Sequence, residues 1–345
     1  MKILIDSYNT CNQNKAGGVQ VRIKKIVELL EEKGIEVDLF NKFNTKVKDY
    51  DILHIFMLTP ENYSLIKYAK NQGLKVVIST IIPLINGIKI DIYRHLIKIP
   101  IPTTYKIMIQ SLQLADMLIV ETPAEKNFII KHYKVKENKI HVIPNGMDEI
   151  EKKTFDIYKY INRGKKYILQ VGRFDKNKNQ LNVIKALKNT NIDVVFIGGP
   201  QDKRDSYYKK CQKEAEGYEN IHFLGWIEKN SPIIKSAYQN AELIVIPSHF
   251  ETFGMVVLEA IAAEKKVAVS NTLPILEYNI IDKTGTFNPN NIEDIKNKVI
   301  NIYKSKKNNV DIVNAKRNFE WNSIIDKHIK CYKEVLNERN IKNNI

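Results

Sequence analysis

Short, almost wholly apolar runs alternate with amphipathic stretches along most of this 345-residue chain. Strands that are apolar at every position are typical of a parallel sheet that is covered by helices on both faces. The stretches between the runs place apolar residues at helical spacing. This alternation restricts the chain to α/β folds in which a parallel sheet lies between layers of helices.

The alternation occurs twice. In the first half we predict strands at residues 2–6, 35–40, 51–56, 74–79, 116–120 and 139–143. The predicted helices between them span residues 18–33, 61–71, 105–114 and 123–131. In the second half we predict strands at residues 166–172, 192–198, 220–224, 242–246 and 267–270. A last helix is predicted around residues 321–337.

The sequence therefore predicts two doubly wound, Rossmann-like α/β domains. We expect an N-terminal domain over residues 1–150, a polar linker over 151–164, a second domain over 165–318, and a C-terminal helix and tail over 319–345. A chain of this length suits two domains better than one. Ligands of such sheets bind beyond the carboxyl ends of the strands, so two facing domains predict a cleft between them.

Composition excludes several classes of protein. No run reaches the roughly 18 consecutive apolar residues of a membrane-spanning helix, and the start shows no signal peptide, so we expect a cytoplasmic protein. The three cysteines are far apart, which fits a reduced protein without a thiolate metal site. The net charge of +15 reflects lysines on solvated faces, or attraction to anionic lipid or a phosphorylated substrate; no motif indicates nucleic-acid binding.

The most informative segment spans residues 247–260, where a strand leads into a loop and a helix opens near Gly254. The loop carries Glu251, and the helix carries Glu259 just over one turn beyond its start. Amide groups of residues 252–255 at the helix N-terminus suit sugar hydroxyls or phosphate oxygens. Two glutamates at this spacing are common on ordinary surfaces, but here they bracket an apolar helix that begins at a glycine.

A second segment, residues 171–179, ends a strand at a glycine and then carries Arg173 and Lys178. Arginine suits forked recognition of phosphate oxygens, and lysine adds a point charge beside it. Together they could neutralise a departing diphosphate without a metal, although a solvated basic loop is the alternative. A third segment, Gly17-Gly18, opens the first helix and would admit a phosphate or sugar close to the backbone, or simply cap the helix.

These segments resemble retaining glycosyltransferases of family 4, which have the GT-B fold. The matching features, in chain order, are Gly17-Gly18, Ile143-Pro144-Asn145-Gly146-Met147-Asp148, Gly172-Arg173 with Lys178, and Glu251 with Glu259. Further matches are Gly198-Gly199-Pro200, Leu224-Gly225-Trp226 and Gly285-Thr286-Phe287. The resemblance covers nearly the whole chain and suggests a role in bacterial surface-glycan synthesis.

The resemblance implies a binding site for a nucleotide diphosphate sugar. Arg173 and Lys178 would bind the diphosphate, Glu259 the ribose and Glu251 the transferred sugar, so Glu251, Arg173 and Lys178 would be the catalytic residues. The other donor contacts that it implies are Gly17, Gly18, Trp226, Thr252, Phe253 and Gly254. The last helix would cross back to the N-terminal domain at Trp321. No histidine or carboxylate motif suits a metal, so we expect neither metal nor cofactor.

The N-terminal half departs from the family in one respect. Family members often carry a His-Asp pair after the fourth strand, where this chain reads Ser79-Thr80-Ile81-Ile82-Pro83. His54 remains as a possible contact for acceptor or sugar, with a structural role as the alternative. Residues 81–110 interleave apolar residues with Lys89, Arg94 and Lys98, so they would rest on an anionic membrane or pack on the sheet.

The sequence thus predicts a metal-independent retaining glycosyltransferase that moves a sugar from a nucleotide diphosphate sugar to a glycan or lipid-linked hydroxyl. Two other hypotheses remain open: an inactive GT-B partner subunit, and a nucleotide-sugar hydrolase or epimerase. The sequence does not specify the base, the sugar or the acceptor.

Overall fold

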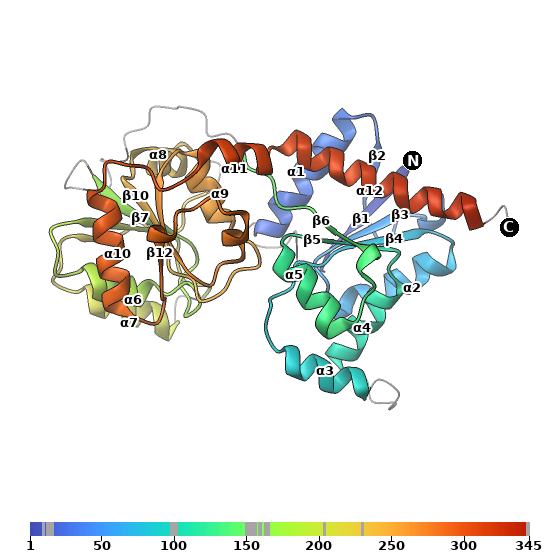
Figure 1. Cartoon of the computed structure of the whole chain (residues 1–345), viewed down its shortest axis with the longest axis horizontal. Helices are drawn as coiled ribbons and strands as arrows, with labels where there is room; N and C mark the ends of the chain where they lie inside the picture. The colour runs from blue at the N-terminus through green and yellow to red at the C-terminus, as the bar shows by residue number, and fades with distance from the viewer. Residues whose placement is uncertain are drawn as a thin grey trace. The chain divides into compact units, whose positions relative to one another are not determined.

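The computed structural model describes residues 1–8, 11, 17–96, 103–148, 157, 161, 166–202, 205–228 and 231–342, of which 338–342 by backbone only. Contacts divide the chain into two compact units (Figure 1). Unit 1 comprises Met1–Gly146 and Phe319–Ile345, and unit 2 comprises Met147–Asn318. The predicted linker over 151–164 lies outside the described residues except for Ile157 and Ile161, which are both buried.

Unit 1 contains a six-stranded sheet in which every pairing is parallel. Its strands are β1 (Lys2–Asp6), β2 (Glu36–Leu39), β3 (Ile52–Phe56), β4 (Lys75–Ser79), β5 (Met117–Val120) and β6 (Ile140–Val142). They lie in the order β2-β1-β3-β4-β5-β6. The six predicted strands of the first half are therefore all present.

The helices of unit 1 are α1 (Gly18–Glu32), α2 (Tyr63–Asn71), α3 (Gly87–His95), α4 (Thr104–Leu114), α5 (Pro123–Phe128) and α12 (Trp321–Lys342). Local signals explain several of their ends: Gly34, with a φ of 74°, follows the first helix, and Thr122 caps α5 ahead of a proline. The predicted helix 123–131 continues past Phe128 as a π-helical turn, Ile129–Tyr133. Helix α3 was not predicted.

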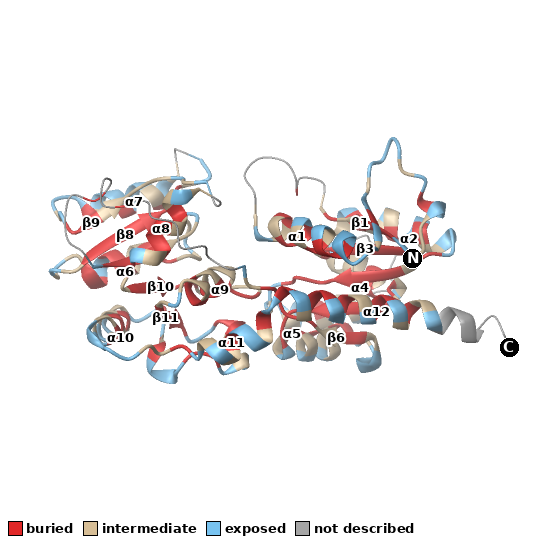
Figure 2. Cartoon of the chain, turned by 90° about the horizontal axis from the view of Figure 1, so that it is seen from above, coloured by how far each residue is buried: buried red, intermediate tan, exposed pale blue. Residues whose placement is uncertain are grey.

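Both faces of the first sheet are covered, as the unbroken apolar strands required. Within β1, Ile3 and Ile5 belong to the cluster that contains α1 and α12, whereas Leu4 belongs to the cluster that contains α2 and α4. Figure 2 shows the central strands, such as β3 and β8, in the colour of buried residues. Helix α12 thus packs in unit 1, although it follows unit 2 in the sequence.

Unit 2 repeats the plan with strands β7 (Tyr167–Val171), β8 (Asp193–Ile197), β9 (Ile221–Phe223), β10 (Leu243–Ile246), β11 (Lys266–Ser270) and β12 (Thr286–Phe287). The order is β12-β11-β10-β7-β8-β9, again with parallel pairings only. Its helices are α6 (Gln180–Leu187), α7 (Ser206–Ala215), α8 (Pro232–Asn240), α9 (Met255–Ala262), α10 (Ile292–Lys304) and α11 (Ile312–Phe319). The two-residue strand β12 was not predicted.

Candidate functional site

The strand order of unit 2 determines where its ligand site should lie. The chain runs outward from β7 through β8 to β9, then returns to pair β10 with the other edge of β7 and continues to β11 and β12. The loops after β7 and β10 therefore leave the sheet in opposite directions, which opens a crevice at the carboxyl ends of these strands. Residues 172–179 and 247–254, singled out from the sequence, are these two loops.

Two glycines bring the carboxyl ends of β7 and β8 close together. Gly172 and Gly198 have φ values of 151° and 129°, which side chains rarely allow. A Cβ atom added to Gly198 would lie 2.1 Å from the carbonyl oxygen of Gly172. The backbone that carries Arg173 can adopt this path only because both positions lack a side chain.

Lys178 and Glu251 meet across the two loops. The Lys178 Nζ atom lies 2.5 Å from Glu251 Oε1, and that oxygen also accepts a hydrogen bond of 2.6 Å from Ser248 Oγ. The side chains of Lys178 and Glu251 are 23% and 17% exposed, so the pair is shielded but still reachable. The structure thus joins two residues that were picked from separate motifs.

Arg173 is the more exposed cation of the site. Its side chain is 52% exposed, and its Nε atom donates to Asp175 Oδ2 at 2.8 Å. Asp175 also accepts from the backbone N–H of Lys178 at 2.9 Å. Asp175 therefore orients the Arg173 side chain and holds the backbone of Lys178, a role that the sequence did not reveal.

Asn177 fastens the two loops to each other. Its side chain donates to the carbonyl of Phe250 at 2.9 Å and accepts from the N–H of the same residue at 3.0 Å, while its carbonyl accepts from the N–H of His249 at 2.8 Å. Asn177 and Ser248 both lie inside the motifs, but neither was assigned a role. Their roles are recognised from their hydrogen bonds in the folded loops, which the spacing of residues in the sequence does not reveal.

Helix α9 begins directly after this loop. Gly254 precedes its first residue in the left-handed region with a φ of 118°, and the Phe253 side chain is buried, while Thr252 is half-buried. The first amides of a helix have no partner within it and carry partial positive charge. Glu259, one turn along, accepts from Tyr238 Oη at 2.6 Å.

Trp226 follows β9, the strand at one edge of the same sheet. Its ring is 45% exposed, and its Nε1 atom donates to the carbonyl of Pro200 at 3.2 Å. A Cβ atom on Gly199 would approach Trp226 Nε1 to 2.7 Å, so this glycine leaves room for the indole. An exposed aromatic ring at the carboxyl ends of the strands suits a flat ligand such as a nucleobase.

The candidate residues of unit 1 differ in accessibility. Gly17 is extended, and a Cβ atom there would meet nothing within 4 Å, while Gly18 is the first residue of α1. His54, for which a ligand contact and a structural role were both considered, is fully buried, with Nδ1 2.8 Å from Tyr332 Oη and Nε2 2.9 Å from Ser79 Oγ. Burial, with His328 and Arg22 nearby, holds the pKa of His54 well below 6.5. Its role here is to join β3 to α12.

Other charged groups of unit 1 are buried as well. Arg22 in α1 pairs with Glu121, and their side chains are only 1% and 4% exposed. Glu125 accepts from Thr80 Oγ1 at 2.6 Å and from the N–H of Glu121 at 2.7 Å. Burial raises the pKa of Glu121, and burial followed by the charge of Glu121 raises the pKa of Glu125 to about 7. These groups connect the loops after β4 and β5.

Among the described residues, one group of side chains could hold a metal ion: His141, Cys331 and Glu334, whose ligand atoms lie within 4.8 Å of one another. They belong to β6 and α12 of unit 1, and none of them was predicted to bind the sugar donor.

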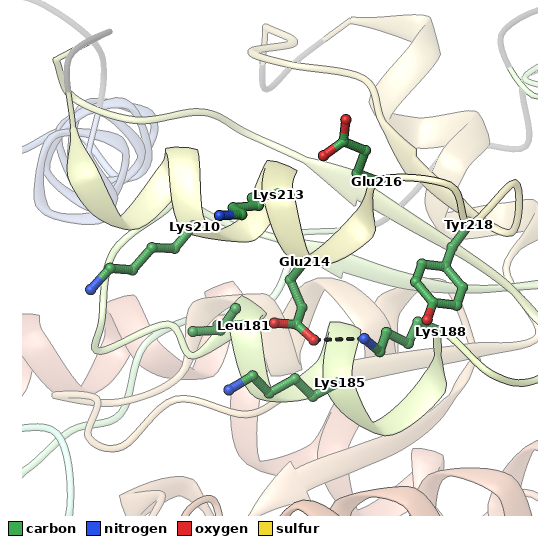
Figure 3. Close-up of a pocket in the computed structure, with 8 residues that line it drawn as sticks. All are labelled: Leu181, Lys185, Lys188, Lys210, Lys213, Glu214, Glu216 and Tyr218. Atoms are coloured by element: carbon green, nitrogen blue, oxygen red, sulfur yellow. Dashed lines mark hydrogen bonds and ion pairs between the residues drawn. The ribbon is translucent and has the colours of Figure 1, made fainter.

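A hollow of about 360 Å³ lies on unit 2 (Figure 3). It lies between α6 and α7, is lined by four lysines among others, and includes none of the site residues above.

No helix in the described part of the chain combines the length and apolar character needed to cross a lipid bilayer.

Two family models match consecutive parts of the chain. The model of "Glycosyltransferase Family 4" matches residues 42–150, and that of "Glycosyl transferases group 1" matches residues 151–319. A glycosyltransferase of Methanocaldococcus jannaschii described as uncharacterized is 28% identical over 243 residues, which are 64% of this chain and 60% of that protein. The D-inositol 3-phosphate glycosyltransferase of Corynebacterium diphtheriae is 25% identical over 181 residues, which are 47% of this chain and 42% of the relative. The chain thus spans less than two thirds of either relative.

Solved structures extend the likeness to the whole fold. The Anabaena protein HepE in complex with UDP has a TM-score of 0.74 and 16% identity, with 97% of this chain and 100% of HepE covered. The same protein has also been crystallised with UDP-glucose. Together with the two parallel six-stranded sheets, these matches confirm the predicted fold. The chain belongs to the family 4 glycosyltransferases and has their two-domain GT-B fold.

Proposed function

We propose that this protein transfers a sugar from a nucleotide diphosphate sugar to a hydroxyl of a glycan or a lipid-linked acceptor, with retention of the anomeric configuration. The observation that carries the proposal is the contact between the loops after β7 and β10: Lys178 pairs with Glu251, and Asn177 bonds to Phe250. Arg173 lies in the same loop as Lys178, and α9 begins directly after the loop of Glu251. Two cations and a helix N-terminus would together form an anion site suited to a diphosphate.

The chemical step breaks the bond between the anomeric carbon and the diphosphate oxygen and forms a bond from that carbon to the acceptor oxygen. Negative charge develops on the departing diphosphate. Arg173, Lys178 and the first amides of α9 would stabilise this charge, a contribution that is made mainly in the transition state. The acceptor hydroxyl would give its proton to the departing phosphate on the same face of the sugar.

The remaining residues would hold the donor in place. Glu251 would accept hydrogen bonds from the sugar, and Glu259 from the ribose. Trp226 would border the base, and the glycines Gly17 and Gly18 of unit 1 would leave room for the donor. The ion pair between Lys178 and Glu251 holds the carboxylate in place before the donor binds. Little conformational entropy of the Glu251 side chain would therefore be lost on binding.

The cations and helix amides would take the part that a metal plays in other transferases, so we propose that no metal is needed. HepE binds UDP and UDP-glucose, which makes uridine donors the first to test.

The experiment is a donor screen. Thermal unfolding would be followed with UDP-, GDP-, ADP- and dTDP-sugars, because a ligand that binds only the folded protein raises the melting temperature. The stabilising donor would then be incubated with glycan and lipid-linked acceptors, and the product examined for a new glycosidic bond of retained configuration. Release of free sugar without acceptor would indicate a hydrolase, and the absence of stabilisation by every donor would indicate an inactive partner subunit.

A further inference from the structure

Exposed apolar side chains are concentrated on one short helix of unit 1. The described residues expose eleven large apolar side chains, and four of them lie within a single stretch of twelve residues. These are Ile85, Ile88, Ile92 and Leu96, exposed by 44%, 78%, 52% and 44%. Scattered single apolar residues need no explanation, but a cluster of four does.

Three of the four side chains form one stripe. Ile88, Ile92 and the C-cap residue Leu96 are spaced four residues apart, which places them on the same face of α3, whereas Ile85 precedes the helix, before the left-handed residue Asn86. The other side of α3 is anchored: Ile90 is 2% exposed, and Tyr93 stacks on Tyr105 of α4 with ring centroids 5.1 Å apart. The helix therefore holds its apolar stripe outward on a fixed support, at the edge of unit 1 in Figure 1.

The exposed charge beside the stripe is positive. Lys89 is exposed there, together with the imidazole of His95. Asp91 is the only acidic residue between positions 81 and 110, and it is held by His132 Nδ1 at 2.9 Å and by Arg94 at 3.5 Å. The hydrogen bond from His132 keeps the pKa of Asp91 below its usual value. An exposed positive charge beside an outward-facing apolar stripe complements a lipid layer whose headgroups are negatively charged and whose interior is apolar.

We propose that α3 is a membrane anchor: its apolar stripe inserts into the headgroup region of an anionic phospholipid bilayer, with the Lys89 ammonium group at the phosphates. Helices that lie in the membrane interface have this combination of apolar and basic faces. A contact between two copies of the chain is the rival, but stable interfaces bury about 800 Å² per partner, more than a stripe on a nine-residue helix supplies.

The anchor lies at the functional end of unit 1. The chain leaves the carboxyl end of β4 at Ser79 and reaches α3 within eight residues, so α3 extends from the edge at which ligands of this sheet bind. A lipid-carrying acceptor embedded in the bilayer would arrive at this edge. This contact does not depend on the proposed function, because a protein without transferase activity would bind vesicles in the same way.

The test is flotation of the full-length protein with vesicles of phosphatidylcholine alone or with 40% phosphatidylglycerol, a composition of roughly the surface charge of an anionic leaflet. Wild type should float with the anionic vesicles and lose binding in 1 M salt, where the Debye length is about 3 Å. The variant I88S/I92S should lower the partition coefficient at least about tenfold. K89Q should lower it about fivefold.

The matched control is F43S/V313S, which removes two apolar side chains that are 83% and 81% exposed outside α3. It should bind like wild type, and all variants should keep the wild-type melting temperature and donor binding. Equal losses in the control and in I88S/I92S would overturn the proposal, as would a wild type that ignores anionic vesicles at low salt. If I88S/I92S instead dissociates a dimer in sedimentation velocity and vesicles bind neither form, the stripe is a contact between copies and the proposal fails.

Discussion

The two units have the same kind of six-stranded parallel sheet, but they differ in how far the ion pairs near the carboxyl ends of the strands are exposed to solvent. In unit 2 the Lys178–Glu251 pair is partly exposed at 23% and 17%, and Arg173 is half-exposed. In unit 1 the Arg22–Glu121 pair is almost completely buried, at 1% and 4%. A pair that water still reaches can exchange its partner for a ligand, whereas a buried pair is committed to the fold.

This difference assigns separate tasks to the two edges. The charged groups of unit 2 would be available to an anionic ligand, whereas the buried charges of unit 1 join α1 and the loops after β4 and β5. Unit 1 instead exposes apolar surface, on α3. Similar topology therefore does not imply similar chemistry, and the accessible groups decide what each unit binds.

The buried pair should show the largest effect. Replacing Arg22 by Met leaves the Glu121 carboxylate buried without its guanidinium, and we expect a loss of about 3–5 kcal/mol in the free energy of unfolding. The matched change in unit 2, Lys178→Met, should cost at most about 1 kcal/mol. Urea unfolding measures both, because Trp321 reports on unit 1 and Trp226 on unit 2. Equal costs would remove the contrast between the units.

The glycine contact of unit 2 should come next. In Gly198→Ala the new Cβ meets the Gly172 carbonyl at 2.1 Å and also requires a φ of 129°, so we expect a loss of about 2–4 kcal/mol. Gly217→Ala is the control, because its φ of 82° is also positive but nothing lies within 4 Å of the Cβ atom. It should cost about 1 kcal/mol. A Gly198→Ala variant as stable as this control would show that the two strand ends can separate freely.

Acid should destabilise unit 1 through its buried histidines. Burial, with Arg22 nearby, lowers the pKa of His328 to about 3, and His54 is shifted in the same direction. Both rings are neutral in the folded protein, but the unfolded chain binds their protons below about pH 6.5. The contribution of each histidine to stability is therefore complete above pH 6.5 and falls by about 1.4 kcal/mol per pH unit as the pH decreases. The raised pKa values of Glu121 and Glu125 act in the opposite direction, so the histidine effect is measured as the difference between wild type and a histidine variant. His328→Leu should reduce this slope by one proton in Trp321-detected unfolding between pH 6 and 4.5; an unchanged slope would contradict the assignment.

Chelation should have the smallest effect, which is none. If Arg173, Lys178 and the α9 amides stabilise the diphosphate, sugar transfer should continue at the same rate in EDTA. Loss of transfer in EDTA, with recovery on addition of Mg²⁺ or Mn²⁺, would assign that task to a metal.

Local signals allowed most of the fold to be predicted from the sequence. Each predicted run became a strand, most of them buried, and glycines and caps marked helix ends such as that of α1 at Gly34. The two-residue β12 was missed because it is too short to show a pattern. Helix α3 was missed because its apolar residues face outward, so the chain around it resembles a long apolar loop.

The site was predictable only where it followed strand–loop–helix junctions. Arg173, Lys178, Glu251 and Gly254 lie at such junctions, and the structure gathers them around the β7 and β10 ends. The sequence could not decide between a ligand contact and a structural role for His54, because its partner Tyr332 lies 278 residues away on α12. The burial of Arg22 depends in the same way on Glu121, 99 residues further along the chain.

The account rests on the claim that the crevice of unit 2 binds a diphosphate through Arg173 and Lys178. The direct measurement is calorimetric titration of wild type, R173A and K178A with the stabilising nucleoside diphosphate and with the corresponding nucleoside. Each substitution should weaken diphosphate binding by about 1.5–3 kcal/mol and leave nucleoside binding nearly unchanged, because the lost contact is charge-assisted and made only to phosphate. Equal losses for diphosphate and nucleoside would contradict the claim.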